Sequence, residues 1–238
     1  MDYKNHIEHY IIDGKYYDYF AFNKFMVVEI NRRYQEILDL GSPKSNSIIM
    51  DIGSGGGGVI SLLKQPDLFY LPIDLSDTNL KRIKEMSGNN TLPVNGDTYH
   101  LPFINDSVDL IIMSEVVEHL SEPLEALKEV RRIMHPEGKL VVSVPYKEEI
   151  SYQICIHCNK PTPTHSHLHS FTIESFRDLL IDSGLIPVKL SKNLNKVINR
   201  LHLNYYLRSI PYRLWKSLDS FSNFLIDKPT SMIFVCHK

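Results

Sequence analysis

Long apolar runs and abundant cysteine are both missing from this sequence of 238 residues. No stretch reaches the roughly 18 apolar residues that a membrane-spanning helix needs, which argues against an integral membrane protein. The N-terminal stretch 1–20 is polar and acidic, unlike a signal peptide, and the chain has only three cysteines. A small, odd number of thiols is typical of a reducing compartment. We therefore expect a cytoplasmic protein.

A strong excess of one charge is also missing, because the formal net charge is −2. The protein as a whole therefore has no electrostatic attraction to nucleic acid or to an anionic membrane. With 43% hydrophobic and 23% charged residues, the composition is that of an ordinary globular protein. The length fits one α/β domain with appendages, so we treat residues 1–238 as a single domain.

Short segments rich in Val, Ile and Leu predict strands at 47–53, 69–74, 92–97, 108–114 and 139–145. Helical periodicity separates them, most clearly in 121–134, where Ser121 fits the N-cap. Strands that alternate with helices form right-handed crossovers, and hence a parallel sheet that is covered on both faces. The sequence therefore predicts a doubly wound α/β core.

Three additions flank this core. Residues 1–40 form a helical lead-in, a Cys/His loop occupies 147–171 before a helix near 172–183, and 191–230 is a long insertion before a last strand at 231–238. The lead-in contains the aromatic stretch YYDYFAF, which either closes over a ligand or packs the lead-in helix onto the sheet.

The stretch MDIGSGGGG (50–58) follows the first predicted strand and is expected to open a helix. Glycine lets backbone N–H groups approach a ligand closely, and a helix N-terminus adds partial positive charge. The glycines fit the G-x-G-x-x-G of dinucleotide sites, and they also fit a D-x-G-x-G-x-G pattern that starts at Asp51. Neither match alone is specific.

Asp51 favours a cofactor without phosphate. A carboxylate two residues before the first glycine would repel the pyrophosphate of a dinucleotide. S-adenosylmethionine carries an ammonium and a sulfonium group instead, and a carboxylate favours both. Two alternatives stay open: Asp51 only hydrogen-bonds the turn, or the protein is a dehydrogenase.

Two further acids end predicted strands. Asp74 lies about 20 residues beyond the glycine loop, where an acidic side chain accepts hydrogen bonds from both ribose hydroxyls. Asp97 ends the third strand, where a carboxylate can reach the amino group of adenine. Because the carboxyl ends of parallel strands share one edge of a sheet, we expect Asp51, Asp74 and Asp97 to line one crevice.

Four stretches (IIMDIGSGGGG, PIDLS, GDTYHLPFINDSVDLIIMSEVVEHL and EVRRIMHPEGKLVVSVPY) resemble successive motifs of the class I S-adenosylmethionine-dependent methyltransferases. The resemblance covers residues 46–146, the cofactor-binding core, and is greatest to the branch that includes quinone-biosynthesis enzymes. It implies a Rossmann-like seven-stranded sheet, mostly parallel with an antiparallel last strand, and helices on both faces. It also implies the residues that hold the methionine end, the ribose, the adenine and the pocket wall: Asp51, Gly53, Ser54, Gly55, Gly57, Asp74, Leu75, Asp97, Thr98 and Ser114.

Methyl transfer is an in-line displacement, so positioning and desolvation can supply most of the rate. A base is needed only for acceptors that must lose a proton. His119 begins a helix beside the cofactor, and we give it a structural role and assign no catalytic residue. The chain lacks an Asn-Pro-Pro-Tyr motif and a Pro-Cys dipeptide, which favours a small-molecule acceptor. An RNA or protein acceptor, and a methyltransferase-like binding or scaffold protein without turnover, stay open as alternatives.

Cys155 and Cys158 have the C-x-x-C spacing of structural zinc sites, and three histidines follow within one loop. We predict a structural zinc ion, because four protein ligands leave no open position. The expected set is Cys155, Cys158, His165 and His167, with His169 as a competing fourth ligand. A solvated histidine-rich loop and a redox C-x-x-C are the alternatives.

The segment from Lys189 to Lys216 holds seven basic residues and no acidic one, interleaved with aromatic side chains. In the resembled family, insertions between the last two strands commonly cover the substrate pocket. We therefore predict an acidic or lipid-linked small-molecule acceptor, with possible peripheral contact between this segment and a membrane. RNA would also fit such a surface, and a solvated face that balances the acidic core is the plainer alternative.

Overall fold

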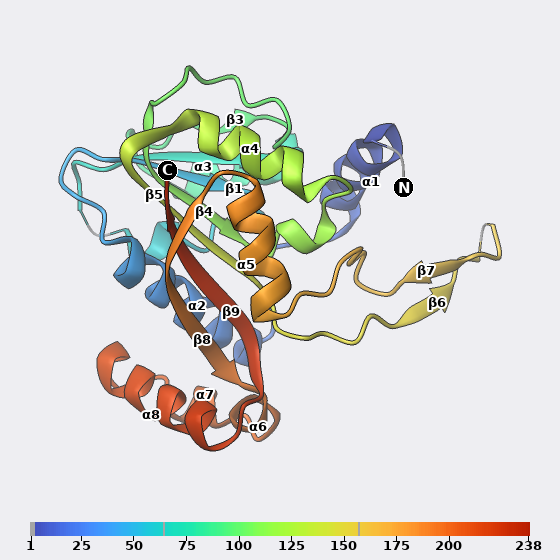
Figure 1. The fold of residues 1–238 in the computed structure, drawn as a ribbon, viewed down its shortest axis with the longest axis vertical. Helices are drawn as coiled ribbons and strands as arrows, with labels where there is room; N and C mark the ends of the chain where they lie inside the picture. The colour runs from blue at the N-terminus through green and yellow to red at the C-terminus, as the bar shows by residue number, and fades with distance from the viewer. Residues whose placement is uncertain (1–2, 64, 157) are drawn as a thin grey trace.

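A seven-stranded sheet forms the centre of the computed structural model, which describes residues 3–63, 65–156 and 158–238. The strand order is β3-β2-β1-β4-β5-β9-β8 (Figure 1). Two further strands, β6 and β7, pair separately as a hairpin. The strands are β1 (Ile48–Ile52), β2 (Phe69–Asp74), β3 (Val94–Asn95), β4 (Val108–Ser114), β5 (Met134–Pro145), β6 (Tyr152–Ile154), β7 (Pro161–Pro163), β8 (Ile186–Asn195) and β9 (Pro229–His237).

Strand directions confirm the predicted topology. The five strands β1 to β5 are parallel to one another, whereas β9 is antiparallel to both β5 and β8. The chain moves outward from β1 to β2 and β3 on one side, and then returns to place β4 on the other side of β1. Such a reversal opens a crevice at the carboxyl ends of the two central strands, where ligands bind in folds of this type.

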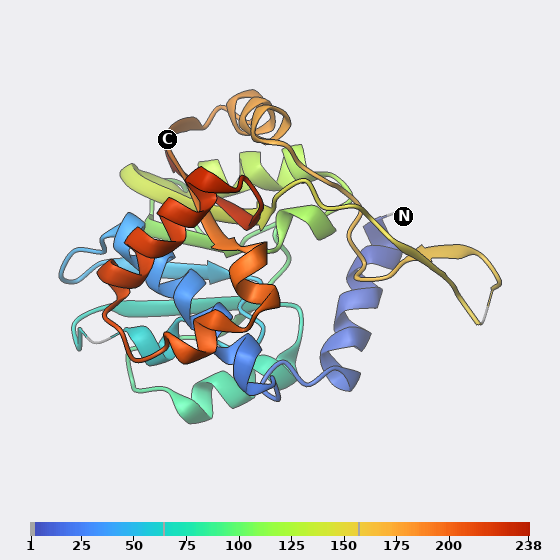
Figure 2. The same ribbon diagram turned by 90° about the horizontal axis from the view of Figure 1, so that it is seen from below.

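Helices cover both faces of the sheet, and none in the described part of the chain is long and apolar enough to cross a bilayer. Figures 1 and 2 show α1 and the β6–β7 hairpin projecting from the same side of the molecule. The helices are α1 (Tyr3–Tyr16), α2 (Lys24–Gly41), α3 (Asp77–Met86), α4 (Pro123–Ile133), α5 (Ile173–Asp182), α6 (Lys196–Arg200), α7 (Leu203–Tyr206) and α8 (Tyr212–Leu225), with 3₁₀ turns η1 (Ile60–Leu62) and η2 (Val117–His119).

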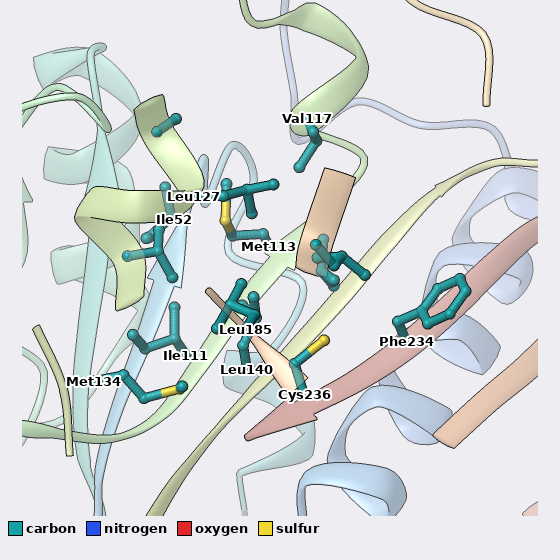
Figure 3. Close-up of a cluster of buried hydrophobic side chains, with 14 of the residues drawn as sticks. Ile52, Ile111, Met113, Val117, Leu127, Met134, Leu140, Leu185, Phe234 and Cys236 are labelled. Carbon is teal, nitrogen blue, oxygen red and sulfur yellow. The ribbon is translucent and has the colours of Figure 1, made fainter. Parts of the chain in front are cut away.

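Two hydrophobic cores lie on opposite faces of the sheet. One is formed by α4 and α5 against the central strands, and includes Ile52, Met113, Leu127 and Phe234 (Figure 3). The other is formed by α2 and α3. Because both faces are buried, the central strands are apolar almost throughout, as the predicted strand 108–114 was.

Several predicted boundaries are wrong. The glycine loop leads only into the short turn η1, so no helix N-terminus points at the crevice from there. Glu122, not Ser121, occupies the N-cap of α4, without a side-chain hydrogen bond. The strand β8 was not predicted, since its exposed residues include Ile186 and Val188 and its buried end holds the polar Asn193, so no apolar run marks a buried face.

The helix α8 turns a polar face toward the protein. Its buried residues Trp215, Asp219 and Asn223 are spaced four apart, on one side of the helix. The Asp219 carboxylate accepts the backbone N–H of Leu194 at 3.1 Å and that of Asn195 at 2.9 Å. These two bonds tie the insertion to the end of β8.

The helix α2 holds the insertion from the other side. The Arg32 guanidinium donates to three carbonyl oxygens between α7 and α8, at 2.9 to 3.2 Å, and lies 5.0 Å from the Trp215 ring. Glu36 is buried and pairs with the Lys216 ammonium at 2.6 Å. The 191–230 segment is therefore a packed part of the domain.

We expect Asp219→Ala to lower the free energy of unfolding by roughly 2–4 kcal/mol, because it leaves two buried N–H donors without an acceptor. Urea denaturation followed by circular dichroism measures this. Asp227→Ala is the matched control, since Asp227 pairs with Lys192 at the surface and should contribute less than about 1 kcal/mol. Equal losses in the two variants would show that Asp219 does not anchor α8.

Candidate functional site

A cavity opens at the carboxyl edge of the sheet, where the chain reverses between β1 and β4. The glycine loop, the ends of β2 and β3 and the segment after β4 line its floor, and α1 with the following turn covers it. The lining includes Gly53, Gly55, Asp74, Asp97, Thr98, Glu115, His119, His6, Tyr10, Asp13 and Tyr19.

The glycine loop needs its glycines for close approach and for backbone conformation. Gly53 has φ +69°, and a Cβ there would lie 2.6 Å from a Val116 methyl group. A Cβ at Gly56 would lie 2.2 Å from the carbonyl oxygen of Tyr19. Residues with side chains would therefore push the lead-in away from the loop.

Asp74 joins the glycine loop to the end of β2. Its carboxylate accepts the backbone N–H of Gly55 and that of Ser76, both at 2.8 Å. Burial raises the pKa of Asp74, and these two hydrogen bonds oppose that shift by favouring the ionised form. The carboxylate is thus held in a fixed position at the cavity wall.

Of the ten residues that the sequence marked for the cofactor, six line this cavity: Gly53, Gly55, Asp74, Leu75, Asp97 and Thr98. The other four, Asp51, Ser54, Gly57 and Ser114, do not line it. Ser114 instead lies within hydrogen-bond distance of Ser143, at 3.2 Å between the two hydroxyl oxygens.

Asp51 is completely buried and is not among the residues that line the cavity. One carboxylate oxygen accepts the Tyr70 hydroxyl at 2.8 Å, and the other has no hydrogen-bond partner. Burial raises the pKa of Asp51 to about 7, although the bond from Tyr70 acts in the opposite direction. The carboxyl group of Asp51 therefore acts inside the protein, beneath the glycine loop.

The lead-in contributes more to the cavity than the sequence indicated. Tyr19, from the predicted aromatic stretch, donates its hydroxyl hydrogen bond to Asp13 at 2.5 Å. His6 and Tyr10 of α1 also line the cavity, and burial raises the pKa of Tyr10. Nothing in the α1 sequence distinguished these side chains from ordinary helix residues, since their role depends on where α1 packs.

A second group of polar side chains adjoins the cavity at η2. Glu118 is fully buried, the Nε2 atom of His119 lies 4.0 Å from its Oε1 atom, and the His119 and His167 rings are 4.6 Å apart. Burial, followed by the neighbouring His167, lowers the pKa of His119 to about 3. The sequence marked His119 and His167 separately, and it gave no sign that they meet.

The predicted Cys₂His₂ set is not assembled in this structure. Cys155 follows β6 at the tip of the projecting hairpin (Figure 1), and Cys158 is exposed in the turn. Among residues 3–63, 65–156 and 158–238, one group of three candidate metal ligands lies close together, and it contains neither cysteine. His167 belongs to that group, with Glu118 and His119.

Comparison with known families matches residues 50–142 to a methyltransferase domain. An uncharacterized protein of Methanocaldococcus jannaschii is 26% identical over 77% of this chain and 78% of its own length. A ubiquinone/menaquinone biosynthesis C-methyltransferase of Roseobacter denitrificans is 29% identical over 52% of this chain. The match spans about half, 53%, of the length of that enzyme.

A solved structure supports the same fold. The 1,6-didemethyltoxoflavin-N1-methyltransferase of Burkholderia thailandensis, with S-adenosylhomocysteine bound, has a TM-score of 0.62 to this chain. The superposition covers 99% of this chain and 86% of that one, at 14% sequence identity. The seven-stranded, mostly parallel sheet is therefore that of a Rossmann-like methyltransferase fold.

The raised pKa of Asp51 predicts how stability changes with pH. The native protein holds the proton up to about pH 7, whereas the unfolded chain releases it near 3.8, so this contribution to stability is lost as the pH rises through about 7. Asp51→Asn mimics the protonated group, so its free energy of unfolding should fall less than that of the wild type between pH 5 and pH 8. Urea denaturation at both pH values measures this, and parallel pH profiles would contradict the assignment.

Proposed function

Because the chain belongs to the class I S-adenosylmethionine-dependent methyltransferases, we propose that it methylates a small-molecule acceptor. The acceptor atom forms a bond to the methyl carbon as the carbon–sulfur bond breaks. The electron pair of that bond goes to sulfur, which yields S-adenosylhomocysteine, and an acceptor that carries a proton on the attacking atom releases it.

The observation that carries this proposal is the position of acidic side chains at the end of the cavity formed by β2 and β3. Asp74 would accept hydrogen bonds from the ribose hydroxyls, with Leu75 beside it, and Asp97 and Thr98 would contact the adenine. Gly53 and Gly55 leave room for the methionine part of the cofactor, because neither has a side chain and both line the cavity. Asp51 would act on the cofactor only through the glycine loop, since it faces Tyr70.

We expect Asp74→Asn to weaken S-adenosylmethionine binding by about 1–3 kcal/mol, or roughly 5- to 150-fold, because a charge-assisted hydrogen bond is lost. Isothermal titration calorimetry measures the affinity. Asp77→Asn is the matched control, since Asp77 lies three residues further on, is exposed and lies outside the cavity lining. Equal affinities in wild type and Asp74→Asn would contradict the proposed ribose contact.

The acceptor side of the cavity is formed by α1 and by the segment after β4. His6, Tyr10 and His119 pack edge to face around it, with ring centroids 4.9 Å apart for His6 and Tyr10, and 5.7 Å apart for Tyr10 and His119. These rings suit a flat or partly apolar acceptor. A quinone-like small molecule is consistent with the quinone-biosynthesis relative.

A lipid-linked acceptor is favoured by the outer face of α8. Its exposed apolar side chains recur at helical spacing at Leu214, Leu218, Phe221 and Leu225. Because the polar face of α8 is buried, its apolar face is exposed to solvent, which is the reverse of an ordinary surface helix. Three exposed arginines lie within α8 or in the segment before it: Arg200, Arg208 and Arg213. An apolar strip with basic neighbours fits the surface of an anionic bilayer.

We predict that the protein binds vesicles that contain anionic lipid, and that binding falls with increasing salt. Reversal of Arg200, Arg208 and Arg213 to Glu should reduce binding at least tenfold in a co-sedimentation assay, whereas vesicles of zwitterionic lipid alone should bind weakly. Cofactor affinity should not change, because these residues do not line the cavity. If the triple variant binds vesicles as well as the wild type does, the basic segment has no role in membrane binding.

Zinc at Cys155, Cys158, His165 and His167 stays a prediction. Its support is the C-x-x-C spacing at the tip of the β6–β7 hairpin. In the structure His167 lies instead beside Glu118 and His119. Zinc binding at the hairpin would therefore require the loop between β7 and α5 to rearrange.

A further inference from the structure

Glu118 is a buried carboxylate without a partner. Its exposed fraction is 0%, and neither of its carboxylate oxygens has a hydrogen-bond partner. A buried polar group normally has a partner, because its desolvation otherwise costs several kcal/mol. The side chain of Glu118 therefore lacks a hydrogen-bond partner, and Nε2 of His119 lies 4.0 Å from its Oε1 atom.

Two imidazole rings lie beside this carboxylate, and each has one nitrogen already engaged. The Nδ1 atom of His119 faces the carbonyl oxygen of Ser166 at 3.3 Å, and the Nδ1 atom of His167 contacts the carboxylate of Glu148. Both partners accept hydrogen bonds, so each Nδ1 is the donor, and in a neutral ring Nε2 then offers its lone pair. Histidines that bind metals have this arrangement, in which a carbonyl or carboxylate orients the second nitrogen.

The backbone brings these side chains together. Glu118 and His119 are adjacent in η2. The N–H groups of Leu168 and His169 donate to the carbonyl oxygen of Glu118, at 2.8 and 3.2 Å. That docking places His167 over η2, and the candidate ligand atoms of Glu118, His119 and His167 all lie within 4.8 Å of one another.

We propose that Glu118, His119 and His167 bind a divalent transition-metal ion. Two imidazole nitrogens and one carboxylate are typical of zinc, iron(II), manganese or cobalt sites that keep a position open for a further ligand. The ion would be a direct partner for the buried carboxylate oxygens, which accept no hydrogen bond. It competes with the predicted structural zinc for His167, and it needs neither Cys155 nor Cys158.

The position of this site suggests what the open coordination position holds. His119 also lines the cavity, so a metal ion on His119 would lie at its acceptor end. A hydroxyl oxygen bound to such an ion loses its proton to water more readily, because the cation stabilises the alkoxide. That oxygen then attacks the methyl carbon as the carbon–sulfur bond breaks. This part of the inference rests on the proposed function and makes the acceptor a hydroxyl compound.

Cobalt(II) is a suitable probe, because its visible absorption reports coordination directly and does not depend on activity. Full-length protein made without a His-tag would be stripped with chelator and titrated with Co²⁺. We expect one equivalent to bind in the wild type, and Glu118→Gln, His119→Ala and His167→Ala each to weaken binding at least tenfold. Glu148→Gln should weaken it by roughly 10- to 100-fold, as for other outer partners of metal-bound histidine.

The matched controls are His165→Ala, which removes an exposed histidine two residues from His167, and the double variant Cys155→Ser/Cys158→Ser. Both should bind Co²⁺ as the wild type does. Binding that survives in Glu118→Gln and His119→Ala but is lost in the cysteine variant would overturn this site in favour of the hairpin. Absence of Co²⁺ binding to the wild type would overturn it outright.

Two further measurements distinguish a loss of metal binding from misfolding and from a loss of cofactor binding. Glu118→Gln should keep the melting temperature of the metal-free wild type, because no hydrogen bond is lost, and Co²⁺ should raise that temperature only in the wild type. S-adenosylmethionine affinity should be unchanged in His167→Ala, which lies outside the cavity lining. If the metal site is wrong, Co²⁺ will not bind but S-adenosylmethionine still should. If Co²⁺ binds and S-adenosylmethionine does not, the result argues against the proposed function and not against the metal site.

Discussion

The burial of carboxylates at the carboxyl edge of a parallel sheet is the constraint on which this site depends. Parallel strands bury both faces, so any acid at their ends loses much of its water. The three buried acids differ in the hydrogen bonds that they accept. Asp74 accepts two backbone N–H groups, Asp51 accepts one hydroxyl, and the carboxylate oxygens of Glu118 have no hydrogen-bond partner among the described residues. The number of hydrogen bonds that each acid accepts therefore falls from β2 through β1 to η2.

The central strands could be predicted from the sequence because burial on both faces leaves an unambiguous apolar run. The predicted strand 108–114 coincides with β4, whereas β3 is reduced to two residues at the edge of the sheet. The strand β8 escaped prediction for a physical reason. It lies at the opposite edge, and its partly exposed residues have no apolar run to distinguish them from a loop. Sequence pattern thus located the buried centre of the sheet and lost accuracy at both edges.

The candidate site, like the sheet, could be predicted only in part from the sequence. Asp74 and Asp97 could be placed because a strand end fixes where an acid lies relative to its neighbours. Asp51 has the expected position in the chain, but its carboxylate accepts the Tyr70 hydroxyl and does not line the cavity, which the strand pattern alone does not reveal. His6 and Tyr10 could not be found, because α1 reaches the cavity only through tertiary packing.

The meeting of His119 with His167 depends on a feature that no local pattern records. Two backbone N–H groups dock on the carbonyl oxygen of Glu118, and this contact joins segments nearly fifty residues apart. The histidine-rich loop therefore has two competing uses: its spacing suits the cysteines of the hairpin, but its docking presents His167 to η2. Backbone hydrogen bonds to a buried carbonyl are retained more readily than contacts at an exposed turn, because the buried groups cannot exchange them for water. That difference favours the histidine cluster at η2 and leaves the hairpin cysteines at the periphery of the site.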